Sequence, residues 1–124
     1  MTIARNPDTA GWWRLPQRTV SELISARSSG AQQTCVRIVR LDAPGASRAR
    51  VRHRHTRLEE VIYIERGEAE MLIGEARIRV QAGDAVAIPP GTWHCTLPLV
   101  EEVRLVCFFP DPAPEKDYEE EPVP

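Results

Sequence analysis

Short runs with a two-residue period, each ended by glycine or proline, fill the chain from residue 35 to residue 109. The chain has 124 residues with eleven prolines and seven glycines, a turn-rich composition that favours short strands over helices. Cys35–Leu41 is rich in β-branched residues and ends at the turn signal Ala43-Pro44-Gly45. The pattern therefore predicts one all-β domain, a small sandwich or barrel.

Further strands are predicted along the same stretch. A hairpin is expected over residues 60–74, with its tip at residues 65–68. Other strands are expected at residues 48–55, 76–80, 85–91, 92–97 and 103–109. The apolar side chains expected to line the barrel are Ile38, Ile62, Ile64, Met71 and either Val106 or Phe108.

The two ends of the chain differ from this middle part. Residues 1–34 are expected to form an irregular lead-in that packs on the barrel or at a dimer interface, with one or two helical turns at Thr19–Ala26. The adjacent Trp12 and Trp13 are candidates for interface anchors, because aromatic residues are enriched there. Residues 110–124 are rich in proline and carry six acidic residues against Lys116, so this acidic tail is expected to be disordered or draped over a neighbour.

Composition argues against several classes of function. The net charge is -2, which favours no nucleic-acid partner, and no apolar run is long enough for a signal peptide or a membrane span. Three widely spaced cysteines make a disulfide framework improbable and favour reduced thiols in the cytoplasm. Cytoplasmic location and a small-molecule partner are therefore the expectations.

The stretch ARVRHRHTRLEE, residues 49–60, holds two of the three histidines of the chain. Strand alternation places His53 and His55 on one face with Val51, which should be the core face. The arginines at 48, 50, 52 and 54 then share the opposite face. Such a row is expected to be a solvated outer face or a charged edge rather than an anion site.

Two further side chains are expected to join the histidines. Glu60 shares a face with Ile62 and Ile64 on the next strand, and His94 follows a strand and turn far along the chain. Imidazole and carboxylate groups together are ligands for first-row transition metals. Fewer protein ligands than coordination positions would leave room for water, oxygen or a substrate.

These residues resemble the cupin family in its small single-domain form. The first cupin motif, G-x(5)-H-x-H-x(3,4)-E-x(6)-G, is matched by His53, His55, Glu60 and Gly67; Glu59 would satisfy the shorter gap but not the spacing to Gly67. The second, G-x(5)-P-x-G-x(2)-H-x(3)-N, is matched at Gly83, Pro89, Gly91 and His94. Four matched positions at fixed spacing are far more specific than a lone glycine pattern.

The resemblance covers residues 35–109 and departs from the motifs at two turn positions. Ser47 stands where the opening glycine is expected, and Pro98 stands where the final asparagine is expected. The resemblance implies a double-stranded β-helix, or jelly-roll barrel, and a homodimer. It also implies one divalent metal ion per chain at His53, His55, Glu60 and His94.

Iron or manganese is the first expectation for this ion, with nickel, copper or zinc as alternatives. The first functional hypothesis is a non-haem dioxygenase acting on a small chelating substrate, because no histidine is left over as a general base. Glu60, Tyr63 and Arg57 are the candidate catalytic residues, although Tyr63 alternates to the face opposite Glu60. Arg57 could bind a substrate carboxylate.

Other hypotheses stay open at this stage. One is a metal-dependent isomerase or lyase acting on a sugar-derived or carboxylated metabolite. Another is a binding or sensor protein without catalysis. The histidines and Glu60 could also form a hydrogen-bonded polar cluster that holds no ion. Because the same fold hosts many activities, the fold alone does not decide among them.

Overall fold

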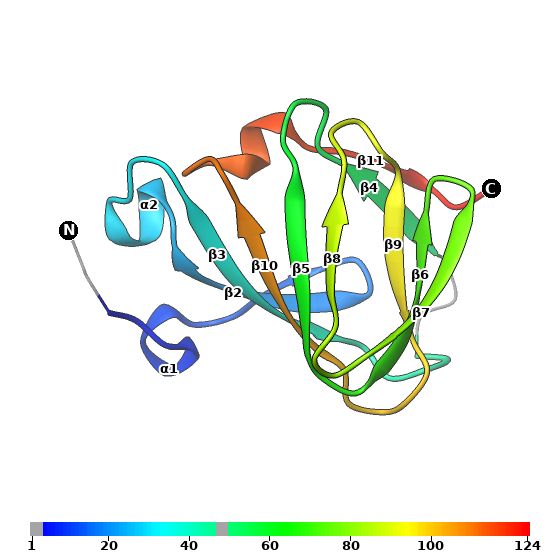
Figure 1. The fold of residues 1–124 in the computed structure, drawn as a ribbon. Coiled ribbons are helices and arrows are strands. Elements are labelled where there is room, and N and C mark those ends of the chain that lie inside the picture. The colour runs from blue at the N-terminus through cyan, green and yellow to red at the C-terminus, as the bar shows by residue number, and fades with distance from the viewer. Residues whose placement is uncertain (1–3, 47–49) are drawn as a thin grey trace.

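Two antiparallel sheets face each other around a shared core (Figure 1). The computed structural model describes residues 4–46 and 50–124. The six-stranded sheet has the order β1 (Trp13–Leu15), β2 (Arg18–Ile24), β3 (Cys35–Leu41), β10 (Arg104–Phe109), β5 (Glu60–Arg66), β8 (Ala85–Ile88). The five-stranded sheet has the order β11 (Glu119–Pro122), β4 (Val51–Arg54), β9 (His94–Pro98), β6 (Glu68–Ile73), β7 (Ala76–Gln81). The predicted all-β jelly-roll barrel is confirmed.

Three short helical segments accompany the sheets: α1 (Pro7–Ala10), α2 (Ala26–Ser29) and the 3-10 turn η1 (Pro114–Asp117). The side chain of Asn6 caps α1 and that of Ser25 caps α2, and each helix is followed by a glycine with positive φ. The first two helices lie at the same end of the barrel (Figure 1). The strands therefore carry the architecture and position the site.

The core between the sheets is built from alternate residues of facing strands. Ile64 of the six-stranded sheet and Met71 of the five-stranded sheet are both fully buried. Each fully buried aliphatic side chain of this size contributes about 1.5–3 kcal/mol relative to an exposed one. The predicted lining residues Ile62, Ile64 and Met71 belong to this core cluster.

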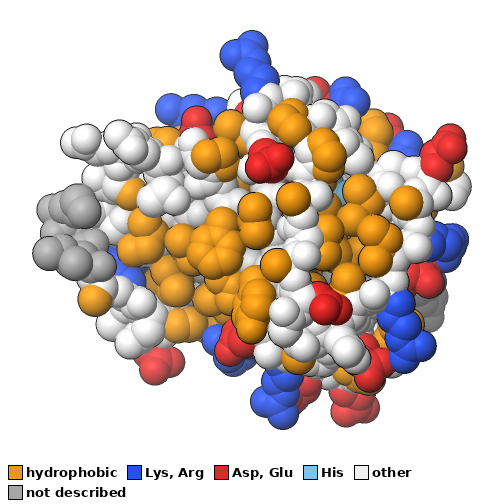
Figure 2. Space-filling view, in the orientation of Figure 1, with side chains coloured by type: hydrophobic (Ala, Val, Ile, Leu, Met, Phe, Trp, Pro, Cys, Tyr) orange, Lys and Arg blue, Asp and Glu red, His pale blue; other side chains and the backbone are white. Residues whose placement is uncertain are grey.

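The residues of strand β10 that face the core are not the ones that were expected to face it. Leu105, Cys107 and Phe109 are buried in the core, whereas Phe108 is 41% exposed and Val106 is half-buried. The prediction that Val106 or Phe108 lines the barrel was therefore wrong. Side chains alternate between the two faces of a strand, so an error of one residue exchanges the buried set for the outer set. Phe108 is instead an exposed residue of the six-stranded sheet. Hydrophobic side chains gather on the face of the molecule that Figure 2 shows.

The predicted hairpin over residues 60–74 is not formed. Strand β5 pairs with β10 and β8, while β6 pairs with β7 and β9, so the chain changes sheets at Gly67. Gly67 has a φ of 90°, and a Cβ atom there would lie 2.2 Å from the carbonyl oxygen of Glu102. The glycine that suggested a hairpin tip thus permits a crossing between sheets, and the hairpin in this region is β6–β7.

Residues 18–24 form a strand where helical turns were expected at Thr19–Ala26. Strand β2 pairs with β1 on one side and β3 on the other, and Val20 on it is only 1% exposed. Helix propensity is a weak preference that tertiary pairing overrides. The helical turn exists only as α2, which begins where the prediction ended.

The arginine face of β4 is partly covered by other groups. Arg52 and Arg54 both lie over the ring of Trp93, at 5.3 and 4.5 Å from its centroid. Arg54 also contacts Glu119 at 3.0 Å, and Arg52 contacts Glu121. The predicted strand started at residue 48, but Ser47, Arg48 and Ala49 lie outside the described residues. An outward arginine face is observed, yet it is paired rather than freely solvated.

The acidic tail packs on its own barrel. Strand β11 pairs antiparallel with β4, so that Glu120 lies opposite His53 in the register. Asp117 accepts hydrogen bonds from the backbone N–H groups of Thr56 and Arg57, at 2.9 and 2.7 Å. The expectation of a disordered tail, or one lying on a neighbour, was therefore wrong. Glu119 lies opposite Arg54 and Glu121 opposite Arg52 in the register, and these opposite charges favour the pairing.

Candidate metal centre

Three predicted ligands come together from both sheets. His53 lies on β4 and His94 begins β9, and these two residues are directly opposite each other in the five-stranded sheet. Glu60 begins β5 of the six-stranded sheet and is paired there with Ile88. Because the side chains at these positions point between the sheets, the cluster bridges the two layers of the barrel.

The distances within this cluster suit a shared cation. One ligand atom from each of His53, Glu60 and His94 lies within 4.8 Å of the others. Nε2 of His94 lies 3.1 Å from Oε1 of Glu60, and Nε2 of His53 lies 4.0 Å from the same oxygen. The two imidazole rings are 4.3 Å apart between centroids. Glu60 and His94 are buried, and His53 is half-buried.

The hydrogen bond on the far side of His94 favours metal ligation. Nδ1 of His94 lies 2.9 Å from the backbone carbonyl of Thr92, a position in which it donates its proton. Nε2 then presents a lone pair toward a carboxylate oxygen, and two acceptors at this distance need a proton or a cation between them. Ligating histidines commonly donate their second N–H to a carbonyl in this way. The donor set therefore fits a divalent metal.

His55 lies in the same pocket but outside the group of three. It follows β4, is 4% exposed, and its ring lies 6.2 Å from that of His53 and 4.8 Å from that of Phe109. Its Nδ1 is buried and has no hydrogen-bond partner among the described residues. A buried imidazole nitrogen without a partner is rare in proteins, and coordination of a metal ion would supply the partner.

Burial sets the charge of this cluster. Burial, followed by the charges of His94 and Arg18, lowers the pKa of His53 well below its ordinary value. Burial also lowers the pKa of His55. Both imidazoles are thus neutral at pH 7, which is the form that binds metals. Burial raises the pKa of Glu60, but hydrogen bonding and charge from its neighbours, His94 first, lower it more, so the carboxylate is ionised.

The cluster opens into an interior pocket that is lined largely by apolar side chains. The pocket has a volume of about 50 Å³, room for a few water molecules or one small organic molecule. Its apolar lining includes Val20, Ile62, Leu105 and Phe109. The polar lining residues that sequence reasoning missed are Gln17, Arg18, Arg37 and Tyr118.

Tyr118 reaches the pocket from the acidic tail. Its ring lies 5.5 Å from that of His53 and 5.8 Å from that of His55. Its hydroxyl lies 3.5 Å from Nη2 of Arg18 and also contacts Glu120. Burial and the hydrogen bond to Glu120 raise the pKa of Tyr118, which keeps the phenol protonated. The sequence signal was weak, a single aromatic residue in an acidic tail.

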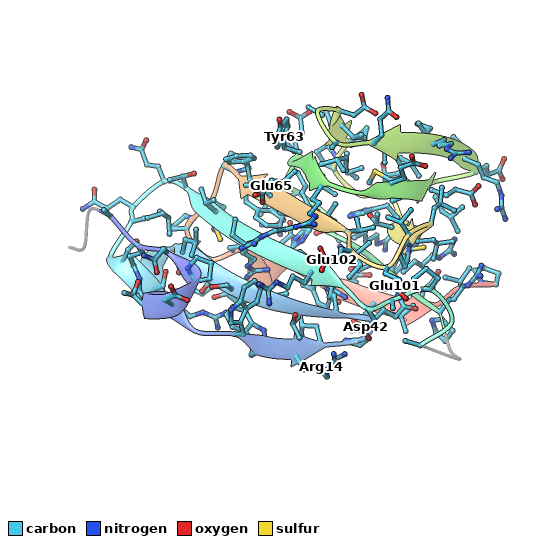
Figure 3. The ribbon with its side chains drawn as sticks, turned by 90° about the horizontal axis from the view of Figure 1, so that it is seen from below. Arg14, Asp42, Tyr63, Glu65, Glu101 and Glu102 are labelled. Carbon is cyan, nitrogen blue, oxygen red and sulfur yellow. The ribbon has the colours of Figure 1, made fainter. Side chains whose placement is uncertain are left out.

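The other two predicted catalytic residues are not brought to the pocket. Arg57 is exposed in the turn between β4 and β5. Tyr63 is 40% exposed on the outer side of β5, and its side chain points away from the barrel interior (Figure 3). Neither residue lines the pocket that holds Glu60 and the histidines.

Comparison with known proteins agrees with this site. A family model described as a cupin domain matches residues 39–109, more than half of the chain. The chain belongs to the cupin family. Both motifs that suggested this family end within the matched region, which contains all the predicted ligands. No curated protein sequence matches the chain.

Solved structures with the same fold include several enzymes. The chain superimposes on oxalate decarboxylase from Lactobacillus farciminis in a formate complex with a TM-score of 0.75 and 22% identity, covering 94% of this chain and 34% of that one. It superimposes on KdgF from Halomonas sp. with a TM-score of 0.63 and 21% identity, covering 83% and 90%. For Pac13, a nucleoside dehydratase of Streptomyces, the TM-score is 0.78 and the identity 10%, covering 98% and 92%. The chain thus spans about a third of the decarboxylase. All three identities are below 25%, so these structural matches show a shared fold alone.

No helix among residues 4–46 and 50–124 is long and apolar enough to cross a membrane. The predicted cytoplasmic location stays a prediction.

Proposed function

We propose that this cupin is a metal-dependent enzyme whose ion is held by His53, Glu60 and His94, with His55 as a fourth ligand. The proposal is supported by the spacing of the first three ligand atoms and by the unpartnered Nδ1 of His55. The pocket beside the ligands supplies room for a small substrate. When bound, a divalent ion would act as a Lewis acid toward substrate oxygens.

The reaction that the ligand set favours is that of a non-haem dioxygenase. Two imidazoles and one carboxylate that converge with open positions are typical of non-haem Fe(II) oxygenases, and His53, Glu60 and His94 form such a group. This observation carries the proposal. With His55 as a fourth ligand, a six-coordinate ion would still keep two positions open. Iron is therefore the first choice of metal and manganese the second, while nickel, copper and zinc accept the same ligands.

A metal-dependent lyase or isomerase is the second candidate, and Tyr118 favours it. The oxygenase hypothesis was preferred from the sequence partly because no separate acid or base was visible. Tyr118 lines the pocket with a protonated phenol that donates its proton to Glu120, and a substrate that takes the place of Glu120 would accept this hydrogen bond or proton. Two of the similar structures are named a decarboxylase and a dehydratase, which adds support to this candidate. Arg57 and Tyr63 are left out of both proposals because neither lines the pocket.

Metal content is the first test of the metal site. Mass spectrometry of the untagged protein should find near one iron or manganese per chain. His94→Ala should lose most of that metal, since it removes a ligand that is fixed by Thr92. A wild-type protein that contains no metal and takes up no Fe(II), Mn(II), Ni(II) or Zn(II) would contradict the enzyme proposal.

Oxygen uptake then separates the two reactions. The Fe(II)-loaded protein is incubated with catechol or with acetylacetone, two chelating probes, in an oxygen electrode. Consumption of probe together with oxygen, absent from His94→Ala, supports the dioxygenase. Turnover that continues without oxygen and falls in Tyr118→Phe supports the lyase or isomerase. Binding without turnover would leave a sensor or binding protein.

The predicted homodimer also stays a prediction. Sedimentation equilibrium of the purified protein measures it directly.

A further inference from the structure

The pocket contains one cationic side chain whose charge is not neutralised by a neighbour. Arg37 and Arg18 both line the pocket. Arg37 donates from Nε and Nη2 to the buried Glu22, at 3.1 and 2.9 Å, so its charge is paired. No carboxylate of the described residues lies within 4.0 Å of the guanidinium of Arg18.

The contacts of Arg18 leave most of its donors free. Nη1 donates to the carbonyl of Pro16 at 2.9 Å, and Nη2 to the hydroxyl of Tyr118 at 3.5 Å. A guanidinium has five N–H groups in a planar fork that matches the two oxygens of a carboxylate. Among the described residues, the other N–H groups of Arg18 have no partner. Arg18 lines the same pocket as His53 and Glu60.

The backbone that carries Arg18 is held in an unusual conformation. Gln17, the preceding residue, has a φ of 67°. Among the described residues it is the only non-glycine residue with a positive φ. Its side-chain amide forms two hydrogen bonds with the backbone of Val51, 2.8 Å to N and 3.3 Å to O. A left-handed conformation costs energy in a non-glycine residue and persists where the surroundings impose it, often at ligand-binding sites. The turn before Arg18 is thereby fixed to β4, two residues from His53.

The charges of the site favour an anionic ligand. This step rests on the proposed function, because it counts a divalent ion at the site. The ion and Arg18 together carry three positive charges, against the two negative charges of Glu60 and of Glu120, which contacts the hydroxyl of Tyr118. A surplus of positive charge in a largely apolar pocket attracts anions more strongly than it would in water.

We propose that Arg18 binds a carboxylate of the substrate, beside the ring of Tyr118. The substrate class is thus a small organic acid, with one end at the metal and a carboxylate at Arg18. The limited volume of the pocket favours the planar carboxylate over a bulkier phosphoryl group. Arg18 and Tyr118 are a hundred residues apart in sequence and meet only in the folded barrel.

Calorimetric titration of the full-length, Zn(II)-loaded protein tests this assignment. Malonate is the anionic probe, malonamide its neutral counterpart of similar shape, and inorganic phosphate the competing anion. Arg18→Gln should weaken malonate binding on the order of tenfold or more, since it removes a charge-assisted hydrogen bond. The matched control is Arg79→Gln, a change at an arginine on the other sheet with a 74% exposed side chain, and it should leave malonate binding unchanged.

The outcomes of this titration are separable from those of the metal test. Metal content is measured first on each variant, and circular dichroism confirms that Arg18→Gln is folded. Arg18→Lys, which keeps the charge and loses the fork, serves as a second variant and should bind malonate with intermediate affinity. If Zn(II) binds but malonate binds Arg18→Gln as tightly as wild type, or no better than malonamide, the assignment fails while the metal site stands. Phosphate binding that is tighter than malonate and depends on Arg18 would overturn the carboxylate class. If Zn(II) does not bind but malonate still depends on Arg18, the anion site stands and the proposed function fails.

Discussion

Glu22 and Glu60 are both buried glutamates of this barrel, at 3% and 4% exposure, but their surroundings differ. Glu22 contacts two guanidinium groups, Arg27 at 2.6 Å and Arg37 at 2.9 Å, and accepts a hydrogen bond from Ser25. Glu60 has the imidazoles of His94 and His53 as its neighbours, at 3.1 and 4.0 Å from its Oε1 atom. No arginine or lysine of the described residues lies within 4.0 Å of Glu60.

The difference shows how a structural carboxylate is distinguished from a ligand. A buried charge is tolerated only when it is paired and hydrogen-bonded. Glu22 satisfies this condition with side chains of its own chain. Glu60 has no guanidinium beside it, and two of the imidazoles near it, those of His53 and His55, are neutral by their lowered pKa values, so a bound cation would complete its environment. A hydrogen-bonded polar cluster that holds no ion therefore accounts for the burial of Glu22 better than for the burial of Glu60.

Replacing Glu22 should give the largest effect. Glu22→Gln leaves the guanidinium of Arg37, only 11% exposed, without its buried carboxylate partner, so the free energy of unfolding should fall by about 3 kcal/mol. Metal content per folded chain should not change. Urea unfolding and mass spectrometry measure the two quantities. Glu115→Gln is the matched control, because Glu115 contacts the same arginine at 3.5 Å but is exposed, and its effect should stay below about 1 kcal/mol. Equal effects of the two variants would contradict the structural role given to Glu22.

Glu60→Gln should show the opposite pattern. The amide oxygen can still accept a hydrogen bond, so the unfolding free energy of the metal-free protein should change by less than about 1 kcal/mol. Metal affinity should fall at least about tenfold, since a neutral amide is a poorer ligand than a carboxylate. Competition with a chromophoric chelator measures this affinity. Glu59→Gln, at the exposed neighbouring position, should bind metal like wild type. A loss of metal in Glu59→Gln but not in Glu60→Gln would reassign the ligand.

The pH dependence of stability should give the smallest effect. Burial raises the pKa of Glu22, but the hydrogen bond from Arg27 and the charge of Arg37 lower it more, and the pKa ends below its ordinary value of 4.5. The carboxylate therefore contributes stability above about pH 4.5, and this contribution is lost as the pH falls through the value in the folded protein. The difference in unfolding free energy between wild type and Glu22→Gln should be constant from pH 7 to pH 5. It should then shrink by at most about 1.4 kcal/mol per pH unit. A difference that grows on acidification would mean that the pKa of Glu22 is raised, not lowered, in the folded protein.

The metal cluster could be predicted from the sequence because it depends on local rules. Strand alternation places His53 on the core face, and the spacing to Glu60 and His94 follows two motifs that are visible in the chain. Arg18 and Tyr118 could not be predicted in this way. Their meeting depends on β1 and β2 extending one sheet and β11 extending the other, and no local pattern encodes that pairing. Tyr118 in particular lies in a segment whose composition resembles a disordered tail.

The errors in the fold have similar causes. Gly67 is compatible with a hairpin tip and with a crossing between sheets, and only the close approach of Glu102 distinguishes the two. The segment 18–24 has no strong preference for helix or strand, and its neighbours β1 and β3 decide the outcome. The lining of β10 was shifted by one residue because both faces of that strand are apolar.

The ligands come from strands of both sheets, and this has a kinetic consequence for any ion that they hold. Opening of the barrel between β5 and the β4–β9 pair would separate Glu60 from His53 and His94. Release of the ion would therefore require the two sheets to separate locally. A bound ion would then cross-link the two sheets. The lifetime of the complex would be set by how often the barrel opens, and amide hydrogen exchange in β4, β5 and β9 would slow on metal loading, with β7 unaffected.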